Sequence, residues 1–241
     1  MNDNHEKKTA YIGGIAQNYD QKRFSSEQGK LFAQLELNQL SKALRIVGPP
    51  PGKVIEVGCG TGRFSKYMAD NGYDVTGTDP SPDMVALSKQ KYGNTDNLLF
   101  LEAWGDSLPY PDNSFDFAFT IRVLNQTSSR EDALKIVTEM TRVVKGGGYL
   151  LVEFVNGNRP VKKKSKNVRL TLRDFSDHES LRSLKRLRVG GVAVFSQTLM
   201  NALPAPLIGL WRILELMAAA LLHPWASRRY VLFYKEAEEA R

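Results

Sequence analysis

The stretch VIEVGCGTGRF, residues 54–64, has glycine at every second position from residue 58 to residue 62. Glu56 comes first, and Gly58, Gly60 and Gly62 follow it. A backbone without side chains lets a ligand approach closely, and the N–H groups at the start of a following helix attract oxygen atoms. The spacing therefore predicts a nucleotide-type binding turn between a strand and a helix.

A second acid, Asp79, lies seventeen residues after Gly62, at the end of the next expected strand. At the carboxyl edge of an open parallel sheet, a carboxylate in this place accepts hydrogen bonds from ribose hydroxyls. These features predict an adenosine-containing cofactor, either a dinucleotide or S-adenosylmethionine. The spacing departs from the dinucleotide pattern G-x-G-x-x-G, whereas Glu56 could favour the ammonium group of a methionine moiety.

Strand and helix patterns alternate from residue 53 to residue 155. Short apolar runs predict the strands, and apolar residues three or four apart predict the helices. This alternation predicts an α/β fold with a Rossmann-like, mostly parallel sheet and helices on both faces. The expected strands are 53–57, 73–79, 97–103, 114–124 and 146–155, and the expected helices are 62–72, 81–92 and 129–144.

The flanking segments complete one structural domain with three expected regions. Residues 1–52 are expected to form a helical N-terminal cap, with a helix over 24–47 that GPPPG ends. Residues 53–155 are the expected cofactor-binding core, and residues 156–241 a basic lid or substrate region with closing strands. The elements expected in that last region are an exposed loop over 156–167, a helix over 177–188, an apolar helix over 206–224 and an antiparallel strand pair, 190–196 and 228–236.

Four ordered segments of the core resemble the class I S-adenosylmethionine-dependent methyltransferases. They are VIEVGCGTGRFS, VTGTDPSPDMVALSKQK, LPYPDNSFDFAFTIRVLNQ and EDALKIVTEMTRVVKGGGYLLVEF. The chain is most similar to the small-molecule group that includes the ubiquinone/menaquinone C-methyltransferases, and IAQNYDQKRF resembles the helical cap of that group. The resemblance fades after residue 156. It implies S-adenosyl-L-methionine as the cofactor and a small or lipophilic acceptor.

The resemblance also implies which residues bind the cofactor. The loop glycines would line its methionine and ribose portion, Glu56 would set the ammonium end, and Asp79 would hold the ribose. Arg122 would contact the methionine part, and Tyr19 in the cap could close over the cofactor. The full implied set is Tyr19, Glu56, Gly58, Cys59, Gly60, Gly62, Asp79, Pro80, Met84, Trp104, Gly105, Asp106 and Arg122.

The chain departs from the resemblance beside the expected adenine. Where many relatives have an acid for the adenine amino group, this sequence has Trp104. Either the indole of Trp104 stacks on the adenine, or Asp106 replaces the missing acid two residues later. Met84 and Gly105 would complete this side of the site.

The acceptor side is less clearly marked. Asn125 and Gln126 follow the fourth expected strand, where a substrate would approach, and His178 lies in the expected lid. None of these is a convincing general base, so no catalytic residue is assigned. Arg23, close behind Tyr19, is expected on a solvated helix face. The three histidines lack the spacing of metal ligands, so no metal site is predicted.

Charge is concentrated in one segment. Of a net charge of +7, residues 159–188 contribute eleven basic residues against three acidic ones. Such a patch would suit an RNA or protein acceptor, but Phe175 is its only aromatic residue, so base stacking has little support. The single cysteine, Cys59, and a polar N-terminus indicate a cytoplasmic protein.

Three functions therefore remain open. The favoured one is a methyltransferase that acts on a small or lipophilic acceptor by in-line displacement. The others are an RNA or protein methyltransferase that uses residues 159–188, and a cofactor-binding protein without transfer chemistry. The apolar helix over 206–224 is too short and too charged to span a bilayer, and is expected in the core or in a homodimer contact, with a membrane-surface or lipid-substrate role as the alternative.

Overall fold

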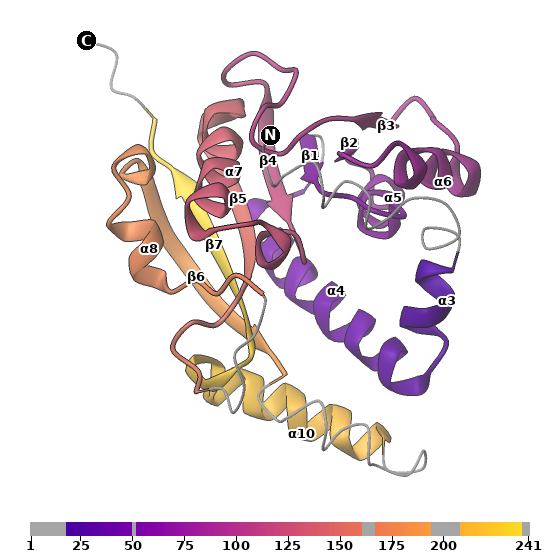
Figure 1. The fold of residues 1–241 in the computed structure, drawn as a ribbon, viewed down its shortest axis with the longest axis vertical. Helices are drawn as coiled ribbons and strands as arrows, with labels where there is room; N and C mark the ends of the chain where they lie inside the picture. The colour runs from indigo at the N-terminus through magenta and orange to yellow at the C-terminus, as the bar shows by residue number, and fades with distance from the viewer. Residues whose placement is uncertain (1–17, 50–51, 161–166, 194–207, 238–241) are drawn as a thin grey trace.

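The computed structural model describes residues 18–49, 52–160, 167–193 and 208–237. Strands and helices alternate along most of this chain (Figure 1). The elements are α3 (Tyr19–Phe24), α4 (Glu27–Val47), β1 (Lys53–Val57), α5 (Arg63–Asp70), β2 (Asp74–Asp79), α6 (Pro82–Tyr92), β3 (Leu98–Glu102), β4 (Phe115–Thr120), η2 (Leu124–Gln126), α7 (Arg130–Val143), β5 (Val144–Val155), α8 (Leu172–Ser176), η3 (Glu179–Leu181), β6 (Leu184–Val192), α10 (Ile208–Leu221), η5 (His223–Trp225) and β7 (Arg228–Lys235).

The described strands form one sheet in the order β3-β2-β1-β4-β5-β7-β6. β1 pairs in parallel with β2 on one side and with β4 on the other. The strand order therefore reverses at β1, and a crevice at the carboxyl ends of such strands is where open α/β sheets bind ligands. The glycine loop that follows β1 lies at this edge.

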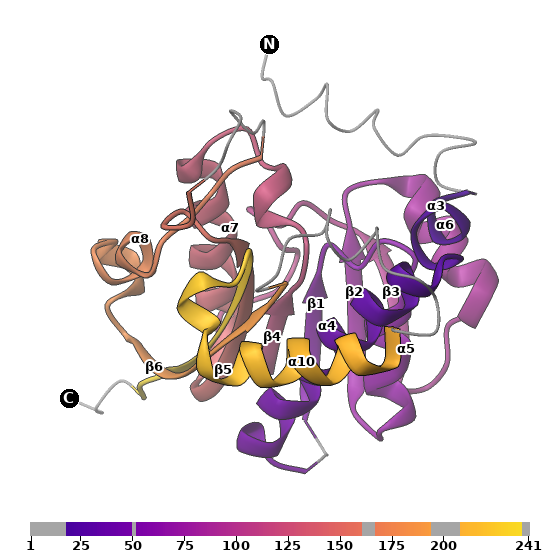
Figure 2. The same ribbon diagram turned by 90° about the horizontal axis from the view of Figure 1, so that it is seen from below.

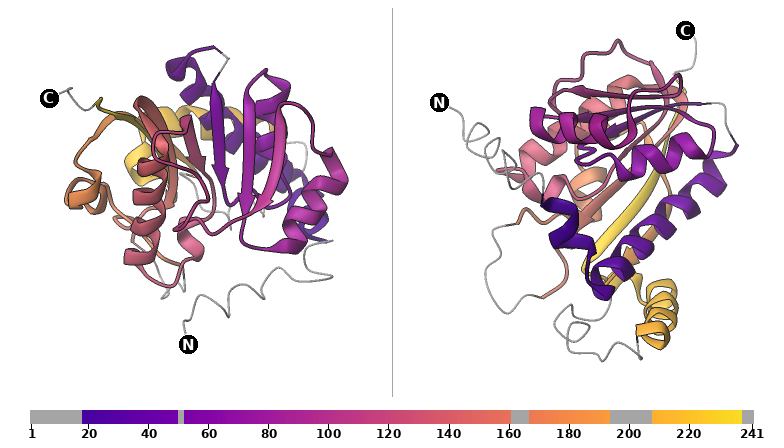
Figure 3. Two further views of the ribbon diagram at one scale, coloured as in Figure 1. Left: turned by 90° about the horizontal axis from the view of Figure 1, so that it is seen from above. Right: turned by 90° about the vertical axis from the view of Figure 1, so that its right-hand side faces the viewer.

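Helices cover both faces of the sheet (Figure 3). On one face, apolar side chains of α4, α5 and α6 pack with Val54, Val75 and Phe119 of the strands. On the other face, α7 and α8 pack against Ile55 and Val152. The mostly parallel sheet with helices on both sides confirms the fold expected from the sequence.

The two last strands confirm the expected antiparallel pair, but they correct its first boundary. β7 pairs antiparallel with both β5 and β6, and β6 already begins at Leu184. The helix expected over 177–188 is therefore wrong, since only η3 and the end of α8 are helical near it. Backbone pairing with β7 overrides the local helical pattern, and the charged residues of the segment suit an exposed edge strand.

The fourth strand is shorter than expected and ends at Thr120 rather than at residue 124. The cause is Arg122, whose φ of 69° lies in the left-handed region and interrupts the extended backbone. η2 follows at once. Residues 121–127 therefore form a loop at the carboxyl edge of the sheet instead of further strand.

Two helix starts agree closely with the sequence. The Ser81 hydroxyl accepts a hydrogen bond from the Met84 N–H at the start of α6, and Ser129 accepts one from Asp132 at the start of α7. Gly72, just beyond α5, has a φ of 88°, as expected for a left-handed residue after a helix. These local signals position the loops that carry the site.

The expected apolar helix is confirmed as α10, over Ile208–Leu221. Among the helices that the structure describes, none has the length and apolar character needed to cross a bilayer. Parts of several expectations lie outside the described residues, namely residues 1–17 and 50–51 of the cap, the loop residues 161–166, the strand residues 194–196 and residues 206–207 of the apolar helix.

Candidate cofactor and acceptor site

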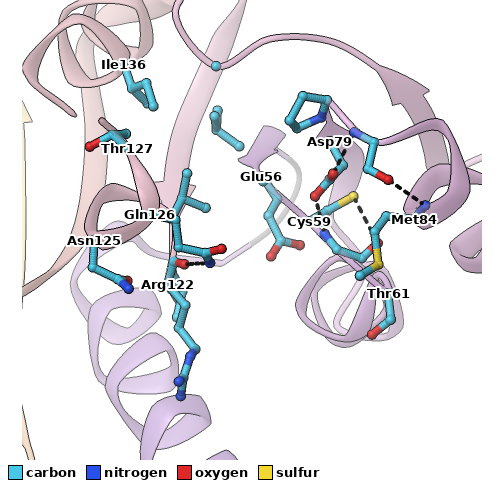
Figure 4. A pocket seen from close by; sticks show the side chains of 18 of the residues that line it. Glu56, Cys59, Thr61, Asp79, Met84, Arg122, Asn125, Gln126, Thr127 and Ile136 are labelled. Carbon is cyan, nitrogen blue, oxygen red and sulfur yellow. Dashed lines mark hydrogen bonds between the residues drawn. The ribbon is translucent and has the colours of Figure 1, made fainter. Parts of the chain in front are cut away.

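A cavity of about 430 Å³ lies at the carboxyl edge of β1, β2 and β4. This volume is within the range of small-molecule sites, about 300–1,000 Å³. Its walls come from the glycine loop, the end of β2, the loop after β3, residues 121–127, and the short helix α3. Figure 4 shows the glycine loop with Asp79 on one side of the cavity and residues 122–127 on the other. Twelve residues of the expected cofactor set line it: Tyr19, Glu56, Gly58, Cys59, Gly60, Asp79, Pro80, Met84, Trp104, Gly105, Asp106 and Arg122.

The three loop glycines serve different purposes, although all have positive φ. A Cβ at Gly58 would lie 2.2 Å from a methyl of Val123, and one at Gly62 would lie 2.7 Å from Phe100. A Cβ at Gly60 would meet no atom within 4 Å. Gly60 therefore leaves the cavity open for a ligand, whereas Gly58 and Gly62 allow close packing. Gly62 is not among the lining residues, which separates it from its expected role at the ligand.

Asp79 organises the glycine loop from the end of β2. One carboxylate oxygen accepts the Gly60 N–H at 2.8 Å, and the other accepts the Ser81 N–H at 2.9 Å. Desolvation by burial raises the pKa of Asp79, although these two N–H groups act in the opposite direction. Each oxygen still has a lone pair for a further donor, so the carboxylate can accept bonds from a ligand with two hydroxyl groups.

Glu56 projects from β1 toward the middle of the cavity (Figure 4). Its carboxyl oxygen accepts a hydrogen bond from the Ser65 hydroxyl at 2.6 Å. Burial raises the pKa of Glu56 to about 8, against the opposing effects of Ser65 and Arg63. Burial therefore favours the neutral form of this carboxyl group near pH 7, and a cation placed beside it would favour ionisation.

The expected adenine side is assembled from α6 and the loop after β3. Met84 is buried at the start of α6, and Trp104, Gly105 and Asp106 line the same cavity. A Cβ at Gly105 would lie 2.8 Å from Val57, so this loop packs directly on β1. Trp104 and Asp106 both border the cavity on this side.

Arg122 lines the cavity, but its guanidinium group is directed to a buried acid. It donates to Glu36 of α4 at 2.8 Å, and Arg63 donates to the other oxygen of the same carboxylate. The Arg122 N–H donates to Glu153 of β5 at 2.6 Å. Glu36 therefore offsets much of the charge of two arginines, which weakens the case for Arg122 as an anion ligand.

Arg23 is a site residue that the sequence pattern does not reveal. The expectation of a solvated helix face is wrong, because Arg23 lines the cavity and one of its buried guanidinium nitrogens, Nη2, has no hydrogen-bond partner. Its guanidinium carbon lies 5.4 Å from the centre of the Tyr19 ring. The short spacing from Tyr19 is the available signal, because residues four apart share one face of a helix.

α3 is fixed over the glycine loop by its acid, Asp20. The Thr61 hydroxyl donates to Asp20 at 2.8 Å, and Lys91 of α6 forms an ion pair with the same carboxylate. These contacts bring Tyr19 and Arg23 to the cavity mouth. Thr61 is a further residue outside the expected set, since a hydroxyl inside a glycine loop gives no distinct sequence signal.

The three acceptor-side candidates are divided by the structure. Asn125 and Gln126 line the cavity, and the buried Asn125 Oδ1 has no hydrogen-bond partner. His178 is not among the lining residues, and it lies between α8 and η3. It cannot serve this cavity because the chain turns into β6 instead of forming the expected lid helix.

Cys59 is buried between two glycines, and burial raises the pKa of its thiol well above the usual value. A thiol held in this form is a poor nucleophile. Its surroundings are those of a small packed side chain. Within the described residues, no group of three His, Cys, Asp or Glu side chains is arranged to hold a metal ion.

Alanine substitutions in the loop should separate packing from ligand space. Gly58→Ala should lower the free energy of unfolding by about 2–4 kcal/mol, because it adds an overpacked methyl group to a left-handed residue. Gly60→Ala should cost only about 1 kcal/mol, since it meets no atom, but its methyl group would enter the cavity. Urea unfolding measures the first effect and ligand titration the second. Equal losses of stability in the two variants would contradict this division.

Part of the chain is similar to known methyltransferases. Residues 55–152 match a family model described as a methyltransferase domain. A putative methyltransferase, YqeM, of Bacillus subtilis is 28% identical over 131 residues, which cover 54% of this chain and 53% of that protein. A demethylmenaquinone methyltransferase of Tropheryma whipplei is 34% identical over 119 residues, with 48% of each chain covered. The match thus spans about half the length of these relatives.

Solved structures resemble the chain over more of its length. The magnesium protoporphyrin IX methyltransferase of Synechocystis, solved with bound SAH, has a TM-score of 0.65 at 15% sequence identity. That match covers 94% of this chain and 97% of the other. At such identity the likeness concerns the fold, and it includes the regions before and after the matched domain.

Proposed function

We propose that this chain, which contains a class I S-adenosylmethionine-dependent methyltransferase domain, transfers a methyl group to a small lipophilic acceptor. The observation that carries the proposal is the pairing of Asp79 with the open Gly60 at the switch point of the sheet. A carboxylate with free lone pairs beside a backbone without side chains fits a ribose.

The lining residues fit S-adenosylmethionine in chemistry. Asp79 would hold the ribose hydroxyls, Met84 and Trp104 or Asp106 would border the adenine, and Glu56 would face the ammonium group. We further propose Arg23 for a carboxylate, because its unpartnered buried nitrogen requires an acceptor and α3 brings it to the cavity. Cys59, Pro80 and Tyr19 would complete the enclosure by packing.

When bound, this cofactor supplies a methyl group activated by a sulfonium. The chain would contribute alignment, which in favourable systems accounts for about 7–11 kcal/mol of barrier lowering. Tyr19 and Arg23 on α3 would close the site, and the apolar wall from Ile121, Val123 and Ile136 would exclude water from the reacting atoms. No lining residue is assigned as a general base, so the attacking atom of the acceptor must react without a base from the chain, having lost its proton to solvent before the transfer or losing it to solvent afterwards.

The acceptor class follows from the site and from the relatives. Near residues 121–136 the cavity is lined by three apolar residues, Ile121, Val123 and Ile136, and by five polar or charged ones, Arg122, Asn125, Gln126, Thr127 and Asp132. The relatives named for quinone methylation make a flat, lipophilic ring a reasonable acceptor. Asn125 Oδ1 would accept a hydrogen bond from a hydroxyl or amine on that ring. We also propose that residues 1–52 act as a cap, residues 53–155 as the cofactor-binding core and residues 156–241 as a lid, and that the protein is cytoplasmic.

A nucleic-acid acceptor has less support. Arg159 donates to the Ala193 carbonyl, and Arg169 donates to the Asn156 carbonyl, so two arginines of the basic segment are used inside the fold.

Isotope-labelled methyl donor, incubated with the protein and a cell extract, tests the proposal directly. A discrete labelled small molecule in the mass spectrum supports it, whereas labelled RNA or protein would replace it.

Cofactor binding should depend on pH through Glu56. Because burial raises its pKa to about 8, the protonated form is favoured at pH 7 before the cofactor binds, and an ammonium group would displace that proton. Affinity should rise by up to about tenfold per pH unit between pH 6 and 8 and then level off. Calorimetry in buffers of different ionisation enthalpy should detect one proton released at pH 7.

Glu56 also determines whether the free energy of unfolding rises or falls with pH. Between the ordinary value of 4.5 and about 8, the folded chain keeps a proton that the unfolded chain has lost. Stability should therefore fall as pH rises through this range, by at most about 1.4 kcal/mol per unit. Glu56→Gln should remove both pH effects, and a variant that keeps them would show that another group titrates.

A further inference from the structure

An apolar stripe runs along the outer side of α10. Leu210, Leu214, Met217 and Leu221 follow each other at spacings of four, three and four residues, and Ile213 lies four residues before Met217, so the five share one side of the helix. With Leu222 and Trp225 they are between 43% and 77% exposed. They supply seven of the ten exposed large apolar side chains in the described chain, which makes the stripe a contiguous patch rather than scattered residues.

The stripe is not needed for packing within the chain. The opposite side of α10 carries the buried residues Glu215 and Ala218, and Trp211 and Leu216 pack against the core under α4. α10 contacts α4 and β6 in this way and runs along the outside of the molecule (Figures 1 and 2). Its outer side faces none of the other described helices or strands. Among the described helices and strands, none covers this side of α10, which leaves it open to a partner.

Cations gather beside this helix. Lys42 and Arg45 of α4 and Arg188 of β6, the basic flank, belong to the two elements on which α10 packs. Burial lowers the pKa of Lys42, and Arg188 and Arg45 lower it further, so the positive groups repel one another. Arg188 also acts on His223 of η5, together with Arg229. Two exposed apolar residues, Ile46 and Leu187, adjoin these cations in sequence.

We propose that α10 and the basic flank dock the protein on the surface of an anionic phospholipid bilayer. The stripe would enter the boundary between headgroups and acyl chains, and the flank would meet lipid phosphates. Trp225, at the end of the stripe, has the side chain that is enriched at such boundaries. This inference is independent of methyl transfer, since no residue that it uses lines the cavity.

A second copy of the chain fits less well. A two-fold contact places the same patch of both chains face to face. The basic flanks of the two chains would then lie in the same dimer. The charged groups that shift the pKa values of Lys42 and His223 are arginines, with no acidic residue among them. An anionic surface covers the apolar stripe and satisfies the cations together.

Co-sedimentation of the full chain with vesicles tests the proposal. Vesicles of phosphatidylcholine with phosphatidylglycerol should bind the protein at least tenfold more tightly than phosphatidylcholine alone, and 0.5 M salt should weaken that binding. Ile213→Glu with Met217→Glu should reduce binding at least tenfold. Leu99→Glu is the matched control, because Leu99 is similarly exposed on β3, at the opposite edge of the sheet. Binding should also shift the fluorescence of Trp225 to shorter wavelength, and Trp225→Phe should abolish the shift.

Three outcomes would overturn the proposal. The first is no binding to the anionic vesicles at low salt. The second is equal loss in the Leu99→Glu control. The third is a dimer in light scattering that the α10 double variant converts to a monomer, without any vesicle binding. The comparison between the two vesicle types uses the unchanged chain, so it decides the question even where a variant folds poorly.

Discussion

Asp79→Asn should weaken the binding of S-adenosylmethionine by at least 100-fold, while the protein remains folded. The carboxylate now accepts two backbone N–H groups, from Gly60 and Ser81. An amide of the same size keeps only one oxygen, so its NH2 group must face one of these donors and cannot accept from a ribose hydroxyl. Two charge-assisted bonds at about 1.5–3 kcal/mol each account for a loss of this size. Isothermal titration calorimetry gives the dissociation constants.

Asp74→Asn provides the matched control. Asp74 begins the same strand that Asp79 ends, and it is exposed. The substitution removes the same charge without reaching the cavity, so its dissociation constant should stay within twofold of that of the unchanged protein. A loss below about threefold in Asp79→Asn would sink the assignment of the ribose site. Heat with NADH and none with S-adenosylmethionine would replace the cofactor itself.

The glycine loop illustrates what the sequence can predict. A glycine loop after a buried strand, with an acid at the end of the next strand, is enough to predict that Glu56, Gly60 and Asp79 share one cavity, and all three line it. The prediction succeeds because each signal is local, and because parallel strands bring their carboxyl ends to one edge. The starts of α6 and α7 can be predicted from the sequence for the same reason, since a capping serine bonds to a backbone N–H only three residues later.

Arg23 and Arg122 illustrate what the sequence cannot predict. Their neighbours in the chain suggest one environment for each, but the actual environment comes from distant elements. Arg122 donates a hydrogen bond to Glu36, 86 residues away in the sequence, and this carboxylate offsets the positive charge of Arg122 beside the ligand site. Arg23 reaches the cavity only because Thr61 and Lys91 hold α3 in place. Such long-range pairing has no period or spacing in the sequence.

The error at residues 177–188 has a related cause. The segment has apolar residues that fit a helix, but its conformation is decided by the free edge of β7, more than forty residues later. A later strand that pairs antiparallel with such a segment can hold it in a strand conformation, even where its local sequence favours a helix. His178 lies away from the site for the same reason.

Glu153→Gln should lower the free energy of unfolding by about 3–5 kcal/mol, the largest stability effect that we expect from a single change of charge. Glu153 is fully buried in β5 and accepts a hydrogen bond from Arg228 at 2.5 Å. Arg228 is itself largely buried, and the loss of the carboxylate would leave its cation without an ionic partner. Glutamine keeps an oxygen for the Arg122 N–H, so the loss reports mainly on the ion pair.

A double variant, Glu153→Met with Arg228→Met, should recover most of that loss, because apolar residues of similar volume replace a buried pair at little cost. Glu131→Gln is the control, since Glu131 forms an exposed pair with Lys135 and should cost less than about 1 kcal/mol. Urea unfolding of the four proteins completes the comparison. If the double variant is as unstable as Glu153→Gln, apolar packing does not compensate for the lost pair, and the acceptor that Glu153 provides for the Arg122 N–H is itself needed for stability. Recovery would instead show that the buried pair is dispensable for stability.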